Sequence, residues 1–254
     1  SGAHALKLQT YTPDTITLNI KDGDFLIKDK NSLWAGKSLY DLYEEAHTPW
    51  DWHEPIMKLA QKLGMICFST PFDETSVDFL EELNVPAYKV ASLENNHLPL
   101  LTKIAKTGKP IILSTGLASI ADLHDMIHTI KNAGCNDYAL LKCTSSYPAS
   151  PRNSNVLTIP HMRKMFDCEI GLSDHTLGIG APIAAIAHGA TIIEKHFTID
   201  NNLPGRDNQF SITPIELKSL VDYKNDFELM NRDLGHEMQE IESDVNTNYR
   251  GRWS

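Results

Sequence analysis

Two lysines in apolar, strand-like stretches are the first residues of this sequence that could do chemistry. Lys7 and Gln9 alternate with leucines in Ala5–Gln9, and Lys89 lies in a similar position within Ala87–Ser92. Because successive side chains of a strand point to opposite faces, the two lysines and Gln9 are expected to face inward, away from the leucines. Lysine is rarely fully buried without a partner. The pair therefore indicates either a bound phosphate or carboxylate, or two internal salt bridges.

Small hydroxyl residues end several of the same strand-like stretches. They are Ser69-Thr70, Ser92, Ser114-Thr115-Gly116, Thr144-Ser145 and Ser173. Any one of them could simply cap the next helix. Repetition at the same end of successive strands instead favours a shared rim, where hydroxyls and backbone N–H groups could hold phosphate oxygens.

Two histidines follow consecutive predicted strands, in Gly171-Leu-Ser-Asp-His175 and Ile193-Glu-Lys-His196. By alternation, Ser173 and Glu194 share the inner face with the histidine of their own stretch, whereas Lys195 points the other way. Neighbouring strands would bring both imidazoles to one rim, and neutral imidazole binds divalent transition metals well. The alternative is a surface or core role, which most of the 11 histidines must have.

These residues lie on a repeated unit, in which a short apolar run is followed by a turn and a helical stretch. The seven predicted strands are Ala5–Gln9, Met65–Thr70, Ala87–Ser92, Pro110–Gly116, Tyr138–Ser145, Cys168–Asp174 and Thr191–Phe197. Ser119-Ile-Ala-Asp122 and Thr213-Pro-Ile-Glu216 are capping boxes, and Gly134 and Gly235 are the expected ends of the helices that they open. Alternation of strands and helices predicts a parallel sheet with right-handed crossovers.

The strand count bears on how the sheet closes. A TIM-type barrel needs eight parallel strands, and the sequence supplies seven. We therefore expect a parallel (β/α)8 barrel as a single domain over residues 1–254, with its first strand and helix preceding Ser1. An open doubly wound sheet is the alternative, and the lack of a Gly-rich dinucleotide fingerprint after the opening strand weakens it.

The composition narrows the functional classes. A net charge of −10 argues against a nucleic-acid partner, although a few buried lysines can still attract an anionic small substrate. The four cysteines form no CxxC pair, and three lie in apolar runs, which is typical of reduced core thiols. The sequence shows neither a signal peptide nor a membrane span, so we expect a cytoplasmic protein with no membrane partner.

Taken in order, the motifs closely resemble those of the sialic acid synthase family, whose members condense phosphoenolpyruvate with an amino sugar to make nonulosonic acids. They are Lys7-Leu-Gln-Thr-Tyr-Thr-Pro-Asp14, Ser69-Thr-Pro-Phe72, Ala87-Tyr-Lys-Val-Ala-Ser92, Ser114-Thr-Gly116, Lys142-Cys-Thr-Ser-Ser-Tyr-Pro148, Gly171-Leu-Ser-Asp-His-Thr176 and Glu194-Lys-His-Phe197. Leu39-Tyr-Asp-Leu-Tyr-Glu44 and Thr48-Pro-Trp-Asp-Trp-His53 most resemble the pseudaminic acid branch. The pseudaminic acid branch is also resembled by Lys142 and by the opening run Gln9–Asp14.

The resemblance implies a role for each matching residue. It assigns to phosphoenolpyruvate Lys7, Thr70, Lys89, Ser92, Ser114, Ser145 and Ser173. It assigns His175 and His196 to a divalent metal ion, usually manganese, with magnesium or cobalt as the other candidates. It places Tyr147, Glu194 and Asp207 near the sugar. Lys7, Lys89 and Glu194 are the expected catalytic residues, and Gln9 is expected to bind substrate beside Lys7.

Two features of the family have no counterpart in this sequence. One is a glutamate on the first strand that helps to organise the metal site. The other is a small C-terminal antifreeze-like domain, which supplies an arginine to the partner subunit's active site in a dimer. The sequence stops at Tyr249-Arg-Gly-Arg-Trp-Ser254, near where the connection to that domain would begin. The resemblance therefore implies a homodimer for the full-length form.

The reaction implied is condensation of phosphoenolpyruvate with open-chain 2,4-diacetamido-2,4,6-trideoxy-altrose, which gives pseudaminic acid and phosphate. The same chemistry on another sugar would give legionaminic or N-acetylneuraminic acid. A phosphoenolpyruvate aldolase that uses a phosphorylated sugar is a further alternative. A non-catalytic alternative is a truncated relative that still binds phosphoenolpyruvate.

Overall fold

The computed structural model describes residues 1–254 except 30–33, 206, 234–236, 238 and 249–254, and the side chains of 244–246. Its strands are β1 (Ala5–Thr10), β2 (Ile66–Pro71), β3 (Tyr88–Val90), β4 (Ile111–Ser114), β5 (Tyr138–Cys143), β6 (Glu169–Asp174) and β7 (Ile193–Lys195). All seven predicted strands are therefore confirmed. They pair in parallel and in sequence order, from β1 at one edge to β7 at the other.

Helices alternate with the strands. They are α1 (Pro13–Ile16), η1 (Gly23–Phe25), α2 (Leu39–Ala46), η2 (Trp50–Trp52), α3 (His53–Lys62), α4 (Glu74–Glu82), η3 (Ser92–Glu94), α5 (Leu98–Ala105), α6 (Ile120–Asn132), η4 (Pro151–Asn153), α7 (Thr158–Phe166), α8 (Gly180–Ala187), η5 (Asn208–Phe210), α9 (Pro214–Met230), η6 (Glu240–Glu242) and α10 (Ser243–Asn248). Within the described ranges, no helix is both long enough and apolar enough to cross a membrane.

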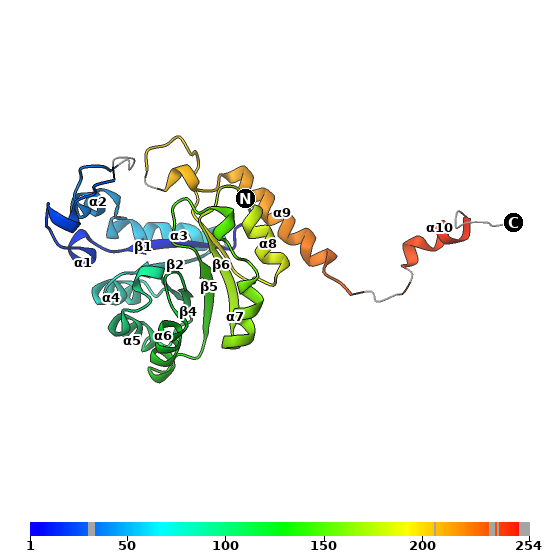
Figure 1. Ribbon diagram of the computed structural model, residues 1–254, viewed down its shortest axis with the longest axis horizontal. Helices are drawn as coiled ribbons and strands as arrows, with labels where there is room; N and C mark the ends of the chain where they lie inside the picture. Colours follow the sequence, from blue (N-terminus) through cyan, green and yellow to red (C-terminus); the bar gives the residue numbers. More distant parts are fainter. Residues whose placement is uncertain (30–33, 206, 234–236, 238, 249–254) are drawn as a thin grey trace.

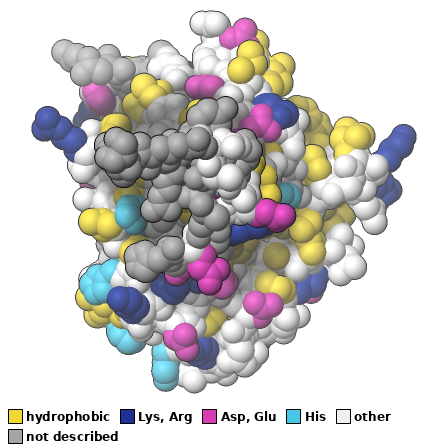
Figure 2. All heavy atoms as spheres, turned by 90° about the vertical axis from the view of Figure 1, so that its right-hand side faces the viewer, with side chains coloured by type: hydrophobic (Ala, Val, Ile, Leu, Met, Phe, Trp, Pro, Cys, Tyr) yellow, Lys and Arg dark blue, Asp and Glu magenta, His cyan; other side chains and the backbone are white. Residues whose placement is uncertain are grey.

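The sheet curls, and helices α4 to α9 follow one another around its outside (Figure 1). This is the layered arrangement of a TIM-type barrel, with seven of the eight strands of a closed barrel among the described residues. The predicted fold class is confirmed. On the face shown in Figure 2, acidic and basic side chains are interspersed with apolar ones over the visible described surface.

Both predicted capping boxes are present. The Ser119 side chain accepts a hydrogen bond from the backbone N–H of Asp122, and α6 then ends at Asn132, two residues before Gly134. Thr213 and Glu216 cap α9 in the same way. That helix ends at Met230, and Gly235, its predicted end, lies outside the described residues.

The hydrophobic core lies between the outer face of the sheet and the helices. Its fully buried members include, from the strands, Tyr88, Val90, Ile111, Leu113, Leu140 and Ile170, and, from the helices, Leu100, Leu101, Ile104, Met126, Ile130 and Ile159. Because these strand residues face outward, the residues between them face the interior of the barrel. Lys89, between Tyr88 and Val90, is 1% exposed, so its predicted inward direction is confirmed.

A buried chain of hydrogen bonds ties the start of α3 to the ends of β1 and β2. Thr10 Oγ1 lies 2.8 Å from His53 Nε2 and 2.7 Å from Ser69 Oγ. The other ring nitrogen, Nδ1, lies 3.3 Å from the carbonyl oxygen of Pro49, so Nδ1 carries the proton and Nε2 accepts from Thr10. Burial lowers the pKa of His53, which keeps the ring neutral.

We expect Thr10→Val to lower the free energy of unfolding by about 1–3 kcal/mol. Valine keeps the shape of threonine but leaves His53 Nε2 and the Ser69 hydroxyl buried without their partner. Urea unfolding at pH 7.5 would measure the change. Thr102→Val is the matched control, since the hydroxyl of Thr102 bonds the Leu98 carbonyl at the exposed surface, where water can replace it. Equal losses in the two variants would contradict the role of the buried chain.

Candidate active site

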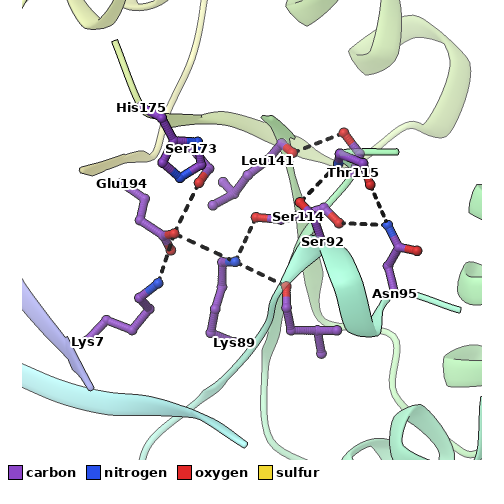
Figure 3. Close-up of polar contacts among 12 residues, drawn as sticks. Lys7, Lys89, Ser92, Asn95, Ser114, Thr115, Leu141, Ser173, His175 and Glu194 are labelled. Carbon is purple, nitrogen blue, oxygen red and sulfur yellow. Dashed lines mark hydrogen bonds and ion pairs between the residues drawn. The ribbon is translucent and has the colours of Figure 1, made fainter. Parts of the chain in front are cut away.

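A cluster of charged side chains lies at the interior of the curled sheet, with Glu194 at its centre (Figure 3). Lys7 Nζ, from β1, lies 2.9 Å from Glu194 Oε1, and Lys89 Nζ, from β3, lies 3.7 Å from the same oxygen. The Ser173 hydroxyl, from β6, donates to it at 3.1 Å. The cluster therefore brings together four predicted site residues, each from a different strand.

The cluster carries more positive than negative charge. Burial alone raises the pKa of Glu194, but Lys7 and Lys89 more than offset this effect and lower the pKa from 4.5 to about 2. The carboxylate is therefore ionised at neutral pH, and two ammonium groups share its single negative charge. Of the two predictions for the lysines, the structure shows the internal salt bridges, and the excess positive charge leaves the cluster able to attract an anion.

Lys89 is the more deeply buried of the two lysines. Its ammonium group donates to Ser114 Oγ at 2.7 Å and to the Val90 carbonyl oxygen at 3.1 Å. Burial lowers the pKa of Lys89 to about 8, and nearby Lys7 adds to this effect while Glu194 opposes it. The group is thus mostly protonated at pH 7 and loses its charge a little above that pH.

Hydroxyl groups surround the lysines, as the sequence predicts. Ser92 Oγ accepts the backbone N–H of Gly116 at 3.1 Å. A side chain at Gly116 would collide with the hydroxyls of both Ser92 and Ser145, so glycine is what allows these strand ends to converge. Thr70 Oγ1 and Ser145 Oγ are buried and have no hydrogen-bond partner among the described residues. Buried hydroxyls without partners are costly, and the oxygens of a bound anion would satisfy them.

His175 and His196 face one another, as predicted, with ring centroids 5.4 Å apart. His175 Nδ1 lies 3.0 Å from the carbonyl oxygen of Thr144, which can only accept, so Nδ1 carries a proton. His196 Nδ1 lies 3.2 Å from Asp207 Oδ2. The Tyr147 ring packs against both histidines, at centroid distances of 4.3 and 6.4 Å.

The side chains around His175 and His196 can be compared with those that metal sites use. Among the residues that the structure describes, no three His, Cys, Asp or Glu side chains converge in a metal-binding geometry. Two imidazoles, one of them oriented by a hydrogen bond from Nδ1 to a carbonyl oxygen, nevertheless suit a divalent ion whose other ligands are substrate oxygens and water. The site therefore fits an open metal centre and does not fit a closed structural one.

The remaining predicted residues lie around this centre. Gln9 is half-buried on β1, on the face that carries Lys7. Tyr147 is 54% exposed and also packs on Phe210, 5.7 Å away between centroids. Asp207 precedes η5 and contacts His196.

Two residues near the cluster were missed by the sequence reasoning. Glu94 has one buried carboxylate oxygen without a partner in the described part of the chain, and burial raises its pKa to about 7, against the opposing charge of Lys89. Cys143 faces the interior, where its thiol contacts His175, Ser92 and Ser173. Glu94 lies in a short 3-10 helix, so strand alternation gives no signal for it. Cys143 follows Lys142 on β5, so the alternation could have identified its inward face.

The comparisons with known proteins agree with this geometry. The NeuB family model matches residues 1–235, and the chain belongs to this family. It is 44% identical to pseudaminic acid synthase of Campylobacter jejuni over 222 residues, which cover 87% of this chain and 64% of that protein. It is 37% identical to N,N'-diacetyllegionaminic acid synthase of Legionella pneumophila over 233 residues, which cover 90% of this chain and 65% of that protein.

A solved structure gives the same result. The N-acetylneuraminic acid (sialic acid) synthetase of Leptospira borgpetersenii, in complex with citrate, superposes with a TM-score of 0.81 at 29% identity, covering 98% of this chain and 83% of that one. The predicted membership of the sialic acid synthase family, with most similarity to pseudaminic acid synthases, is confirmed. The chain spans about 64% of the length of the pseudaminic acid synthases that it matches.

We expect Glu194→Gln to lower the free energy of unfolding by about 3 kcal/mol near pH 7, the low end for breaking a buried pair, because the Glu194 side chain is 20% exposed. The folded pKa is depressed, so the carboxylate stabilises the fold above pH 4.5 and loses this effect as the pH falls towards 2. The gap between wild type and variant should therefore shrink over that window in urea titrations. Glu169→Gln, at an exposed position, should show a small gap throughout.

Proposed function

We propose that this chain forms the catalytic barrel of an enzyme that condenses phosphoenolpyruvate with an open-chain acetamido sugar and releases phosphate. The observation that carries the proposal is the cluster in which two lysines share one carboxylate beside two unpartnered hydroxyls and two facing imidazoles. The names of the relatives support a nonulosonic acid as the product.

The lysine cluster supplies the seat for phosphoenolpyruvate. This substrate carries a phosphate and a carboxylate, and the site offers an excess positive charge with the hydroxyls of Thr70 and Ser145 to bind oxygens. Lys89 is held by Ser114 and the Val90 carbonyl, so its charge is fixed in place before substrate arrives. Fixed charge of this kind lowers the reorganisation needed during the reaction.

The histidine pair supplies the seat for the sugar aldehyde. We propose that His175 and His196 hold a divalent ion, manganese by family resemblance and otherwise magnesium or cobalt. When bound, the ion would polarise the aldehyde oxygen of the sugar and make its C1 electrophilic. The hydrogen bond from His175 Nδ1 to Thr144 keeps the ring in the tautomer that can bind metal.

The bond changes follow from the two substrates. C3 of phosphoenolpyruvate attacks C1 of the sugar, positive charge develops at C2, water adds there, and the tetrahedral product loses phosphate. One proton must leave the water and one must reach the new sugar hydroxyl. Glu94 lies close enough to Lys89 to feel its charge, and its pKa of about 7 allows it to exchange a proton at neutral pH.

The particular sugar is the finer part of the proposal. Identity of 44% to pseudaminic acid synthase, against 37% to the legionaminic enzyme, supports the 2,4-diacetamido-2,4,6-trideoxy-altrose substrate. The aromatic segment from Ser38 to His53 gives weaker support, because Trp50 stacks on Phe79 with centroids 4.6 Å apart and Tyr43 packs on Tyr11. Family resemblance adds a homodimer to the proposal for the full-length protein.

We expect Lys89→Met to weaken phosphoenolpyruvate binding more than a hundredfold at pH 7, since removal of one buried charge partner costs about 3–5 kcal/mol. Wild-type affinity should also fall as the pH rises through about 8, where Lys89 loses its proton, and the variant should lose that dependence. Calorimetric titration would measure both effects. Lys109→Met is the control, because Lys109 pairs with Glu81, outside the barrel interior. A folded Lys89→Met protein with wild-type affinity would refute the anion seat.

The sugar is tested by competition in the full-length enzyme. We expect a higher specificity constant for the 2,4-diacetamido altro sugar than for N-acetylmannosamine, measured as the ratio of the two nonulosonic acids formed with both sugars present. One methyl group in an apolar site contributes only about 1 kcal/mol, so polar groups must supply most of the preference. Preference for N-acetylmannosamine would overturn the pseudaminic assignment and leave the condensation chemistry standing.

A further inference from the structure

A fully buried ion pair directly precedes the two histidines. Asp174 is the last residue of β6, Lys195 is the last residue of β7, and the two are partners in the strand register. Lys195 Nζ lies 2.6 Å from Asp174 Oδ2, and the side chains are only 4% and 3% exposed. A histidine directly follows each strand, and continued alternation puts the ion pair and the imidazoles on opposite faces.

The pair also binds the residue that follows His175. The backbone N–H of Thr176 donates to Asp174 Oδ1 at 3.1 Å, and its hydroxyl donates to Asp174 Oδ2 at 2.9 Å. Lys195 in turn donates to the Thr176 carbonyl oxygen. The two sequence neighbours of His175, Asp174 and Thr176, are therefore both hydrogen-bonded to Lys195, which precedes His196.

Other contacts hold each histidine to a separate loop. The His175 carbonyl oxygen accepts the backbone N–H of Ala149 at 2.9 Å, and the His196 carbonyl oxygen accepts that of Ile212 at 2.7 Å. These bonds fix each histidine against its own neighbour and not against the other histidine. The Asp174–Lys195 pair joins β6 to β7 directly at the level of the two rings.

A buried ion pair at this position is not expected to add much to the free energy of unfolding. Removing two charges from water is costly, and apolar residues of similar volume often replace a buried pair without loss of stability. What the pair does supply is register: a slip of one residue along β7 would move His196 by about 3.3 Å and turn its side chain to the other face. Fixed register is what two ligands of one ion require.

We propose that Asp174, Lys195 and Thr176 are positioning residues that set the separation and orientation of His175 and His196. The inference rests on the proposed metal site for its function. It concerns residues on the outer face of the two strands, whose hydrogen bonds join them to one another.

The test uses the double variant Asp174→Asn/Lys195→Met in the full chain, because either single change would leave a buried charge unpaired. We expect the metal-free double variant to melt within a few degrees of wild type. Its manganese affinity, measured by calorimetry and electron paramagnetic resonance, should fall by about tenfold or more, as for other residues that orient metal ligands. Wild-type affinity in the double variant would overturn the proposal.

Two controls separate positioning from general damage. Arg163→Met/Glu169→Gln removes an exposed ion pair at the opposite end of β6, where the Arg163 and Glu169 side chains are 3.2 Å apart, and should leave manganese affinity unchanged. Met126→Ala removes a fully buried side chain of α6, far from the histidines in sequence. If it weakens manganese binding as much as the double variant at equal loss of melting temperature, the positioning role is refuted.

A third measurement separates this inference from the proposed function. If wild type binds manganese no better than His196→Ala, the metal proposal fails. The positioning role is then tested by NMR on metal-free protein labelled with ¹⁵N-histidine. There the His175 Nδ1 proton, bonded to the Thr144 carbonyl, should give a slowly exchanging downfield signal in wild type and lose it in the double variant. Persistence of that signal in the double variant would overturn the positioning role without reference to any ion.

Discussion

The interaction on which the site depends is the sharing of Glu194 by Lys7 and Lys89. Lys7 and Glu194 lie on the two edge strands, which have no backbone hydrogen bonds to one another among the described residues, so the contact joins the two edges of the curled sheet. Burial lowers the pKa of Lys89, and the Glu194 carboxylate opposes this effect and so helps to keep the lysine charged. The same sharing leaves one positive charge over, and it therefore produces both the closure of the interior and its attraction for anions.

Residues on the outer face of β6 and β7 fix the register of the site residues on the inner face. Alternation places Ser173, His175 and Glu194 in the interior, and it places Asp174 and Lys195 outside, in contact with one another. The buried residues of the outer layer are largely apolar, and this polar pair interrupts them at the ends of β6 and β7. The arrangement shows how a barrel strand can carry substrate-facing groups on one side and the groups that fix their register on the other.

Strand alternation accounts for most of what could be predicted. The repeated apolar runs identified all seven strands, and alternation predicted the inward direction of Lys89 and brought the two histidines to one rim. Alternation has a limit, however. It could not identify which charges meet, because the Lys7–Glu194 contact depends on how far the sheet curls, which no local pattern records. Glu94 was missed for a related reason: its environment comes from burial at the end of β3, in a 3-10 helix with no strand periodicity.

The sequence order of the sheet has a consequence for how the molecule folds. Each strand pairs with the next one along the chain, so the sheet can grow through a series of short loop closures, each with a modest entropy cost. The Lys7–Glu194 contact instead spans 187 residues and can form only after the last strand has been added. Contacts of such separation are formed late because the intervening chain must first be ordered. A partly folded chain would thus have much of the apolar core but not the charge cluster, and binding of an anionic ligand would report completion of folding.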